Sequence, residues 1–445
     1  MSRAPVRQPN LTLAAFSGPC LPLAAVGLPL VLHMPAYYAG PLGLPLAAVG
    51  VAFTFIRLFD ICIDVLLGGA MDATNTRFGR FRVWMAMSAP VLMAGAFLLF
   101  MAKPGVSLIW LWVALLVTYF GFSMGSLAQQ AWASALSSDY NQRSRIYGWW
   151  QSGNILGMIL VLLLPPIVQY GFHGDRTDGV RAMGWFVIIL LPLTIAFAAW
   201  RVGEPKEVSA VVARPAEMLR ILKRPVVARL IVADLLLGCA PAITSILFFF
   251  YFDQIKHVPN ALANLLILAF FVSGLIFAPV WSTLAVKIGK HRALACAALA
   301  LIAGVLILMA TPFTSIAVAI AVMAAAGASY SAPALLLRAM MADAGDELRL
   351  DTGADRTGLL YATLTATTKI GTALAGLSFV ALSAVGFRQG GGNGPLALLW
   401  LQILFVGAPC VLSLAAAALV WRHPLDSRRH GEILAALARQ EAPAS

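Results

Sequence analysis

Charged residues are scarce in this chain of 445 residues, making up 11% of it, whereas 60% is hydrophobic and the mean hydropathy is +0.86. Soluble globular domains carry about 25% charged residues, so this composition excludes that class. One crossing of a bilayer needs about 20 mostly apolar residues, and the length leaves room for roughly 12 crossings with short loops. The chain is therefore predicted to be an all-α membrane protein, with the lipid bilayer as its surroundings.

Cysteine is scarce as well, and the five cysteines fall in apolar runs without a CxxC pair: Cys20, Cys62, Cys239, Cys296 and Cys410. This pattern supports neither a disulfide framework nor a metal site. The sequence also lacks a nucleophile–base set and a phosphate loop, because the GGGNG run at 390–394 follows no predicted strand. We expect neither an enzyme nor a bound cofactor.

Twelve apolar runs predict membrane spans, each good to a few residues. They lie near 15–38, 43–69, 82–102, 107–136, 145–170, 181–201, 227–252, 260–286, 292–311, 314–341, 357–386 and 396–421. The longest polar interruption, 204–225, is predicted to connect an N-terminal six-helix half, 1–203, to a C-terminal six-helix half, 226–422, before a tail, 423–445. The similar turns Gly79-Arg80-Phe81-Arg82 and Gly289-Lys290-His291-Arg292 predict that the two halves are repeats.

The formal net charge of +12 comes from basic residues that gather in alternate loops. No basic face interleaved with aromatic residues is present, so we expect no nucleic-acid partner. By the positive-inside rule, both termini and the connector are cytoplasmic in a bacterial inner membrane, and we expect a monomer. The basic residues on the predicted cytoplasmic side are Arg77, Arg80, Arg82, Arg143, Arg145, Arg220, Lys223, Arg224, Lys287, Lys290, Arg292, Arg422, Arg428 and Arg429.

Three charged residues interrupt the second apolar run, in the stretch RLFDICID. On a helix with about 100° per residue, Arg57, Asp60 and Asp64 fall within about 60° of one another. A charged stripe on an apolar helix must face protein or water, because each charge costs roughly 2.5–3.5 kcal/mol at the bilayer centre. One interpretation is an ion pair between Arg57 and Asp60 that holds helices together.

The other interpretation is a cation site. Two carboxylates one turn apart in a low dielectric need a positive partner, which is a sodium ion, a proton or a lysine from another helix. Lys369 is the lysine candidate, since it lies mid-span among threonines. The ion-pair interpretation leaves Asp64 unexplained, so the pattern favours the cation site.

These residues belong to a longer pattern that resembles the glycoside–pentoside–hexuronide:cation symporter family, and in particular members of the melibiose permease type. The pattern consists of Arg57-x-x-Asp60-x-x-x-Asp64, Gly68, Asp72, Thr76-Arg77-x-Gly79-Arg80-Phe81-Arg82, Asp139-Tyr140-x-x-Arg143-Ser144-Arg145, Pro279-x-Trp281, Gly289-Lys290-His291-Arg292, Ala342-Asp343-x-x-Asp346, Gly353, Arg356-x-Gly358 and Lys369. The resemblance implies a major facilitator fold and symport of a small-molecule solute with a proton, sodium or lithium ion. It also implies that Asp60 and Asp64 carry the cation, supported by Lys369, with Arg57 beside them.

The sequence departs from this family at several places. Ile63 stands where an asparagine often precedes the second carboxylate, and Ala24 and Ala128 stand where melibiose permease-type members carry sugar-binding aspartates. The solute is therefore expected to be less hydroxylated than a disaccharide, or partly apolar. Candidate solute-binding residues are Trp132, Gln151, Gln129, Tyr37 and Thr365.

The resemblance further implies a cytoplasmic gate formed by Asp72, Arg77, Arg80, Arg82, Arg143 and Asp343. Asp234 and Arg338 are predicted to form a gate or a static pair. Three functional hypotheses stay open: a symporter of a small glycoside or related solute, a cation-coupled transporter of an amphipathic solute such as a lysolipid, and a membrane assembly factor or receptor that does not transport.

Overall fold

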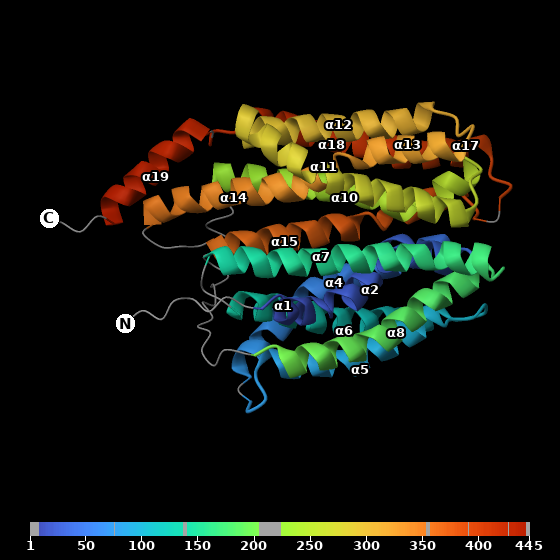
Figure 1. Cartoon of the computed structure of the whole chain (residues 1–445). Helices are drawn as coiled ribbons and strands as arrows, with labels where there is room; N and C mark the ends of the chain where they lie inside the picture. Colours follow the sequence, from blue (N-terminus) through green and yellow to red (C-terminus); the bar gives the residue numbers. More distant parts are fainter. Residues whose placement is uncertain are drawn as a thin grey trace. The chain divides into compact units, whose positions relative to one another are not determined.

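The computed structural model describes residues 9–74, 76–136, 140–203, 224–352, 357–389, 391–425 and 427–441, and every element in these ranges is helical. Within them, 12 stretches are long and apolar enough to cross a membrane, which confirms the predicted number of spans. The chain divides into two compact units (Figure 1).

Unit 1 comprises Met1–Ala210 together with two later segments, Val258–Leu265 and Phe379–Asn393. Its core is a set of packed helices in which α6 lies against both α4 and α5, while α7 lies against α2 and α8. The bounds are α1 Asn10–Ser17, α2 Cys20–Leu32, α3 Met34–Ala39, α4 Leu46–Ala73, α5 Phe81–Phe100, α6 Leu108–Ala135, α7 Tyr140–Pro166, η1 Ile167–Gly171 and α8 Arg176–Arg201.

Unit 2 comprises Val211–His257, Leu266–Ser378 and Gly394–Ser445. In it α10 packs against α15 and α18, and α12 packs against α13, α14 and α18. The bounds are α10 Pro225–Gln254, α11 Asn260–Ile288, α12 Lys290–Ala310, α13 Ile316–Gly327, α14 Ser331–Thr352, α15 Thr357–Leu374, α16 Leu377–Ala384, α17 Pro395–Gln402, η2 Ile403–Gly407, α18 Ala408–Trp421 and α19 Ser427–Glu441.

Both glycine turns of the predicted repeat hold their glycine at a positive φ. Gly79 precedes α5 with φ 102°, and Gly289 precedes α12 with φ 91°. This left-handed region is open to glycine at no steric cost, whereas a side chain is strained there. Each unit therefore uses a glycine with positive φ at the turn into its third span.

Two helical segments extend beyond the predicted spans. The tenth span, predicted to end at 341, continues as α14 to Thr352. The tail, for which no element was predicted, contains α19, and its Ile433 and Leu437 are buried in the hydrophobic core of unit 2. Both segments are too polar to be recognised by hydropathy, and packing of one apolar edge explains why they are helical. The predicted connector lies outside the described residues from 204 to 223.

Candidate functional site

Asp60 lies on the buried side of α4, as the stripe in the sequence predicted. Only 3% of its surface is exposed, whereas Leu58, Phe59 and Val65 are exposed. The hydroxyl of Ser123 on α6 donates to Asp60 Oδ1 at 2.6 Å. This carboxylate in the middle of an apolar helix therefore faces the interior of unit 1, where it has a polar partner on the neighbouring helix, and does not face lipid.

Arg57, one turn before Asp60, bonds to the same neighbouring helix. Its Nε donates to the Tyr119 hydroxyl at 2.7 Å, and its guanidinium carbon lies 5.7 Å from the centre of the Tyr119 ring. A short charge-assisted bond and a cation–π contact together fix the guanidinium against α6. This bond to Tyr119 gives the arginine a role other than the predicted ion pair with Asp60.

Asp64 lies one turn beyond Asp60 and is half-buried. Ile63 beside it is buried and packs with Leu67 and Met124, so it lies on the inner side of α4. Lys369, the predicted support of the cation, belongs to α15 of unit 2 and is half-buried there.

Sequence reasoning missed both hydroxyl partners, Tyr119 and Ser123. They stand four residues apart on α6, so they share one face, and Arg57 and Asp60 stand three apart on α4. A pair of polar residues about one turn apart in each of two apolar spans, the second and the fourth, is the signal that could have found them.

Three of the predicted solute-binding residues are used in packing within unit 1. Trp132 is 1% exposed, donates to the carbonyl of Gly203 at 3.4 Å and meets Phe16 edge to face. Gln129 donates to the carbonyl of Phe16 at 3.0 Å, and the Tyr37 hydroxyl donates to the carbonyl of Ala102 at 3.1 Å. Each of these side chains donates to a backbone carbonyl within unit 1, which favours a role in helix packing.

The other two candidates have accessible side chains. Gln151 is exposed on α7 of unit 1, and Thr365 is exposed on α15 of unit 2. Both remain candidates for contact with a solute, because each side chain is accessible and carries a group that can donate and accept hydrogen bonds.

Three basic residues of the predicted gate, Arg77, Arg80 and Arg82, lie at or just before the start of α5. The guanidinium of Arg77 lies over Phe78, that of Arg80 lies over Phe81, and Arg82 donates to the carbonyl of Val202. Arg82 therefore fastens the beginning of α5 to the end of α8. The side chains of the gate candidates Asp72 and Arg143 lie outside the described residues.

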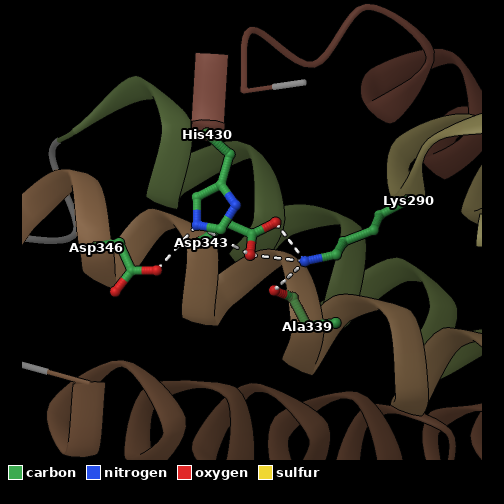
Figure 2. Close-up of polar contacts among 5 residues, drawn as sticks. All are labelled: Lys290, Ala339, Asp343, Asp346 and His430. Atoms are coloured by element: carbon green, nitrogen blue, oxygen red, sulfur yellow. Dashed lines mark hydrogen bonds and ion pairs between the residues drawn. The ribbon is translucent and has the colours of Figure 1, made fainter. Parts of the chain in front are cut away.

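Asp343, the gate candidate of unit 2, is part of a polar cluster that joins three helices (Figure 2). Lys290 at the start of α12 lies 2.7 Å from each oxygen of Asp343. His430 on α19 donates from Nε2 to Asp346 Oδ2 at 2.9 Å and lies 3.5 Å from Asp343 Oδ1. The cluster attaches α19 to α14 through the imidazole.

This cluster also has a metal-like arrangement, because Asp343, Asp346 and His430 each place one ligand atom within 4.8 Å of the others. The ammonium of Lys290 already neutralises Asp343 through both of its oxygens. We therefore interpret the group as an ion-pair network and not as a metal centre.

Comparison with known proteins places the chain among transporters. Residues 15–427 match the family described as MFS/sugar transport protein. The glucuronide carrier protein homolog of Escherichia coli (strain K12) is 22% identical over 413 residues, covering 91% of this chain and 90% of the relative. A lactose permease of Lactobacillus helveticus is 31% identical over 147 residues, covering 29% of this chain and 22% of the relative.

Solved structures agree with this placement at the level of the fold. The nucleoside transporter NupG superimposes with a TM-score of 0.67 at 17% identity, covering 92% of this chain and 99% of that chain. A bacterial homolog of the human lysosomal transporter Spinster gives 0.66 at 14% identity, covering 95% and 98%. Because the family match spans nearly the whole chain, this protein belongs to the MFS/sugar transport protein family, within which its relatives confirm the predicted glycoside–pentoside–hexuronide:cation symporter branch of the major facilitator superfamily.

Proposed function

We propose that this membrane protein moves a sugar-like solute by alternating access and couples the movement to a cation. A sugar-like cargo is supported by the family and by relatives described as glucuronide, lactose and isoprimeverose carriers. Coupling is supported by one structural observation: Asp60 is buried inside a membrane span and bonds to Ser123. An ionisable group in that environment is costly and is therefore a functional candidate.

A proton fits these surroundings better than sodium does. A sodium ion needs several oxygen ligands at once, whereas a proton needs a single carboxylate oxygen. Ile63 offers an apolar side chain where a neutral oxygen would complete a sodium site, and it is packed into the core of unit 1. Ser123 can accept a hydrogen bond from protonated Asp60 as readily as it donates one to the ionised form.

The test is uptake of radiolabelled lactose, raffinose and methyl glucuronide into proteoliposomes under separate proton and sodium gradients, with the membrane potential clamped at zero. Each proton carried per solute supports about tenfold accumulation per pH unit, since one unit corresponds to about 1.4 kcal/mol. We expect Asp60→Asn to lower proton-driven accumulation about tenfold per pH unit while solute exchange without a gradient persists.

The matched control is Asp178→Asn, which removes an exposed carboxylate near the start of α8 and should leave accumulation unchanged. Unchanged proton-driven accumulation in a folded Asp60→Asn protein would contradict the coupling role. Ser123→Ala provides a second variant that keeps the carboxylate, and it should shift the pH at which accumulation is half-maximal.

A further inference from the structure

A second carboxylate is buried in a membrane span, and it lies in unit 2. Among the described residues, the acidic side chains with less than a tenth of their surface exposed are Asp60 and Asp234, at 3% and 9%. Asp234 stands on α10, between the span's first residue, Pro225, and its last, Gln254. The sequence indicated only a gate or a static pair with Arg338 at this place, so the burial of Asp234 needs its own explanation.

The hydrogen-bonding partners of Asp234 include two threonine hydroxyls of α15, those of Thr367 and Thr368. The hydroxyl of Thr368 carries one hydrogen and has two oxygen atoms within hydrogen-bonding distance. Thr368 Oγ1 on α15 lies 3.2 Å from Asp234 Oδ2 and 3.0 Å from the carbonyl oxygen of Leu364. A threonine hydroxyl donates one hydrogen bond and accepts others, whereas a carbonyl oxygen accepts only. Thr368 therefore donates to one of the two oxygens at a time.

Because Thr368 has one hydrogen for two acceptor oxygens, the site has two hydrogen-bonding arrangements, which differ by one proton on Asp234. When Asp234 is ionised, Thr368 donates to it and the carbonyl of Leu364 loses this bond. When Asp234 is protonated, its own O–H donates to Thr368, and Thr368 donates back to Leu364 in the usual manner of a threonine within a helix. In the protonated arrangement, the O–H of Asp234 and the O–H of Thr368 each have an acceptor, which suits a desolvated carboxyl in a membrane span.

Close packing holds the two helices together at this level. A Cβ placed on Gly371 of α15 would lie 3.0 Å from the backbone nitrogen of Cys239 and 3.2 Å from the carbonyl oxygen of Leu235, both on α10. A Cβ on Gly238 would lie 3.8 Å from the Cα of Thr368. Glycine at 371 thus allows α10 and α15 to approach, and this approach brings Thr368 to Asp234.

The charges around Asp234 come from two of the helices packed against α10. The Arg338 guanidinium on α14 acts on Asp234 electrostatically, and Lys369 follows Thr368 on α15. The other packed helices, α17, η2 and α18, contain no charged residue, and on α10 itself Arg229 and Asp253 stand near opposite ends. A cation that acts on a carboxyl favours its ionised form, so the Arg338 guanidinium allows Asp234 to release a proton as well as bind one.

We propose that Asp234 and Thr368 form a second proton-binding site, which loads and unloads one proton per transport cycle independently of Asp60. The proton enters as a bond to a carboxylate oxygen of Asp234 and leaves from the same oxygen, and Thr368 turns its single hydrogen between Asp234 and Leu364 accordingly. The transport part of this proposal rests on the proposed function, whereas the proton-binding part does not.

Proton binding is tested by infrared difference spectroscopy of the full chain in lipid, without any solute. A protonated, hydrogen-bonded carboxyl gives a carbonyl stretching band that moves in heavy water and disappears as pH rises. We expect one such titrating band to be lost in Asp234→Asn and kept in both Asp60→Asn and the surface control Asp253→Asn. Persistence of the band in Asp234→Asn overturns the proposal.

A second variant covers the case in which Asp234→Asn does not fold. Thr368→Val keeps the shape of the threonine and removes its hydroxyl, so the band should move to the frequency of a carboxyl without that bond. Thr368→Ser should restore the original frequency. An unmoved band in Thr368→Val would show that the threonine is not the partner and overturns the proposed site.

Coupling is tested with the proteoliposomes described above. If two protons accompany each solute, Asp234→Asn should lower accumulation about tenfold per pH unit, and the Asp60→Asn/Asp234→Asn double variant about a hundredfold. Unchanged accumulation in Asp234→Asn overturns the second coupling site. If the unaltered protein accumulates none of the three sugars, the proposed function fails, and the infrared titration alone decides whether Asp234 binds a proton.

Discussion

His33 is a buried histidine whose neutral ring is built into unit 1. Its Nε2 lies 2.7 Å from Asn264 Oδ1, and both residues are buried. Burial lowers the pKa of His33 from 6.5 to about 4, because a charged imidazolium would lose its hydration there. The folded protein therefore resists a proton that the unfolded chain accepts.

This lowered pKa predicts that acid destabilises unit 1. The contribution of neutral His33 to the free energy of unfolding is fully present above the unfolded pKa of 6.5. It is lost as pH falls from there towards the folded pKa of about 4. The full difference is worth about 3 kcal/mol. We expect the thermal unfolding midpoint in detergent to fall between about pH 7 and about pH 5, and to fall less in His33→Gln. Equal slopes in the two proteins would contradict this origin.

At the scale of single residues, some features of the site could be predicted from the sequence and others could not. The charged stripe predicted that Asp60 faces protein, because hydropathy exposes any charge inside an apolar run. It could not predict Ser123 or Thr368 as partners, since which hydroxyl meets which carboxylate depends on how neighbouring helices pack. Trp132 and Tyr37 resembled solute-binding residues for the same reason: an aromatic residue with a polar tip suits a binding site and a helix contact equally well.

The helices α5 and α6 approach each other closely at two glycines. A Cβ on Gly121 would lie 2.6 Å from the backbone nitrogen of Leu92, and one on Gly95 would lie 2.6 Å from the Cα of Thr118. Small residues at such contacts let helix backbones touch, which is the main source of helix association in a bilayer.

We therefore predict that Gly121→Ala destabilises unit 1 by about 1–3 kcal/mol, because the helices must move apart to admit the methyl group. The control is Gly69→Ala on α4, where a Cβ meets nothing within 4 Å. That substitution should be neutral, or stabilise by up to about 1 kcal/mol through helix propensity. The thermal unfolding midpoints of the two variants are measured in the same detergent. Equal midpoints would contradict the close approach of α5 and α6 at Gly121.

The positions of the membrane helices were predictable, whereas the shorter polar helices were not. Hydropathy alone locates a span such as α4, because lipid requires every residue of it to be helical and most to be apolar. The helix α19 has no such requirement, and it depends on Ile433 and Leu437 packing into unit 2. This helix therefore depends on tertiary packing, which cannot be detected from hydropathy averaged along the sequence.

For the molecule as a whole, the orientation in the membrane remains a prediction from the distribution of basic residues. Exposed Lys103 follows the third span, in a loop poor in basic residues. Exposed Lys287 lies in the last turn of the eighth span, beside a turn that is rich in basic residues. The positive-inside rule puts Lys287 in the cytoplasm and Lys103 outside.

Labelling of intact cells checks this orientation. In a cysteine-free background, a membrane-impermeant maleimide should modify Lys103→Cys and leave Lys287→Cys unmodified until the cells are opened. Both positions are exposed, so accessibility to the reagent is matched. The reverse pattern would place both termini outside the cell.

The last helix has a practical consequence for handling this protein. Because His430 anchors α19 to α14 and two of its apolar side chains fill the core of unit 2, a version shortened before Ser427 would leave an open hydrophobic seam and an acidic pair without its imidazole. Affinity tags or fluorescent reporters at this end belong after Glu441, and shortening the chain to improve crystallisation is better begun elsewhere.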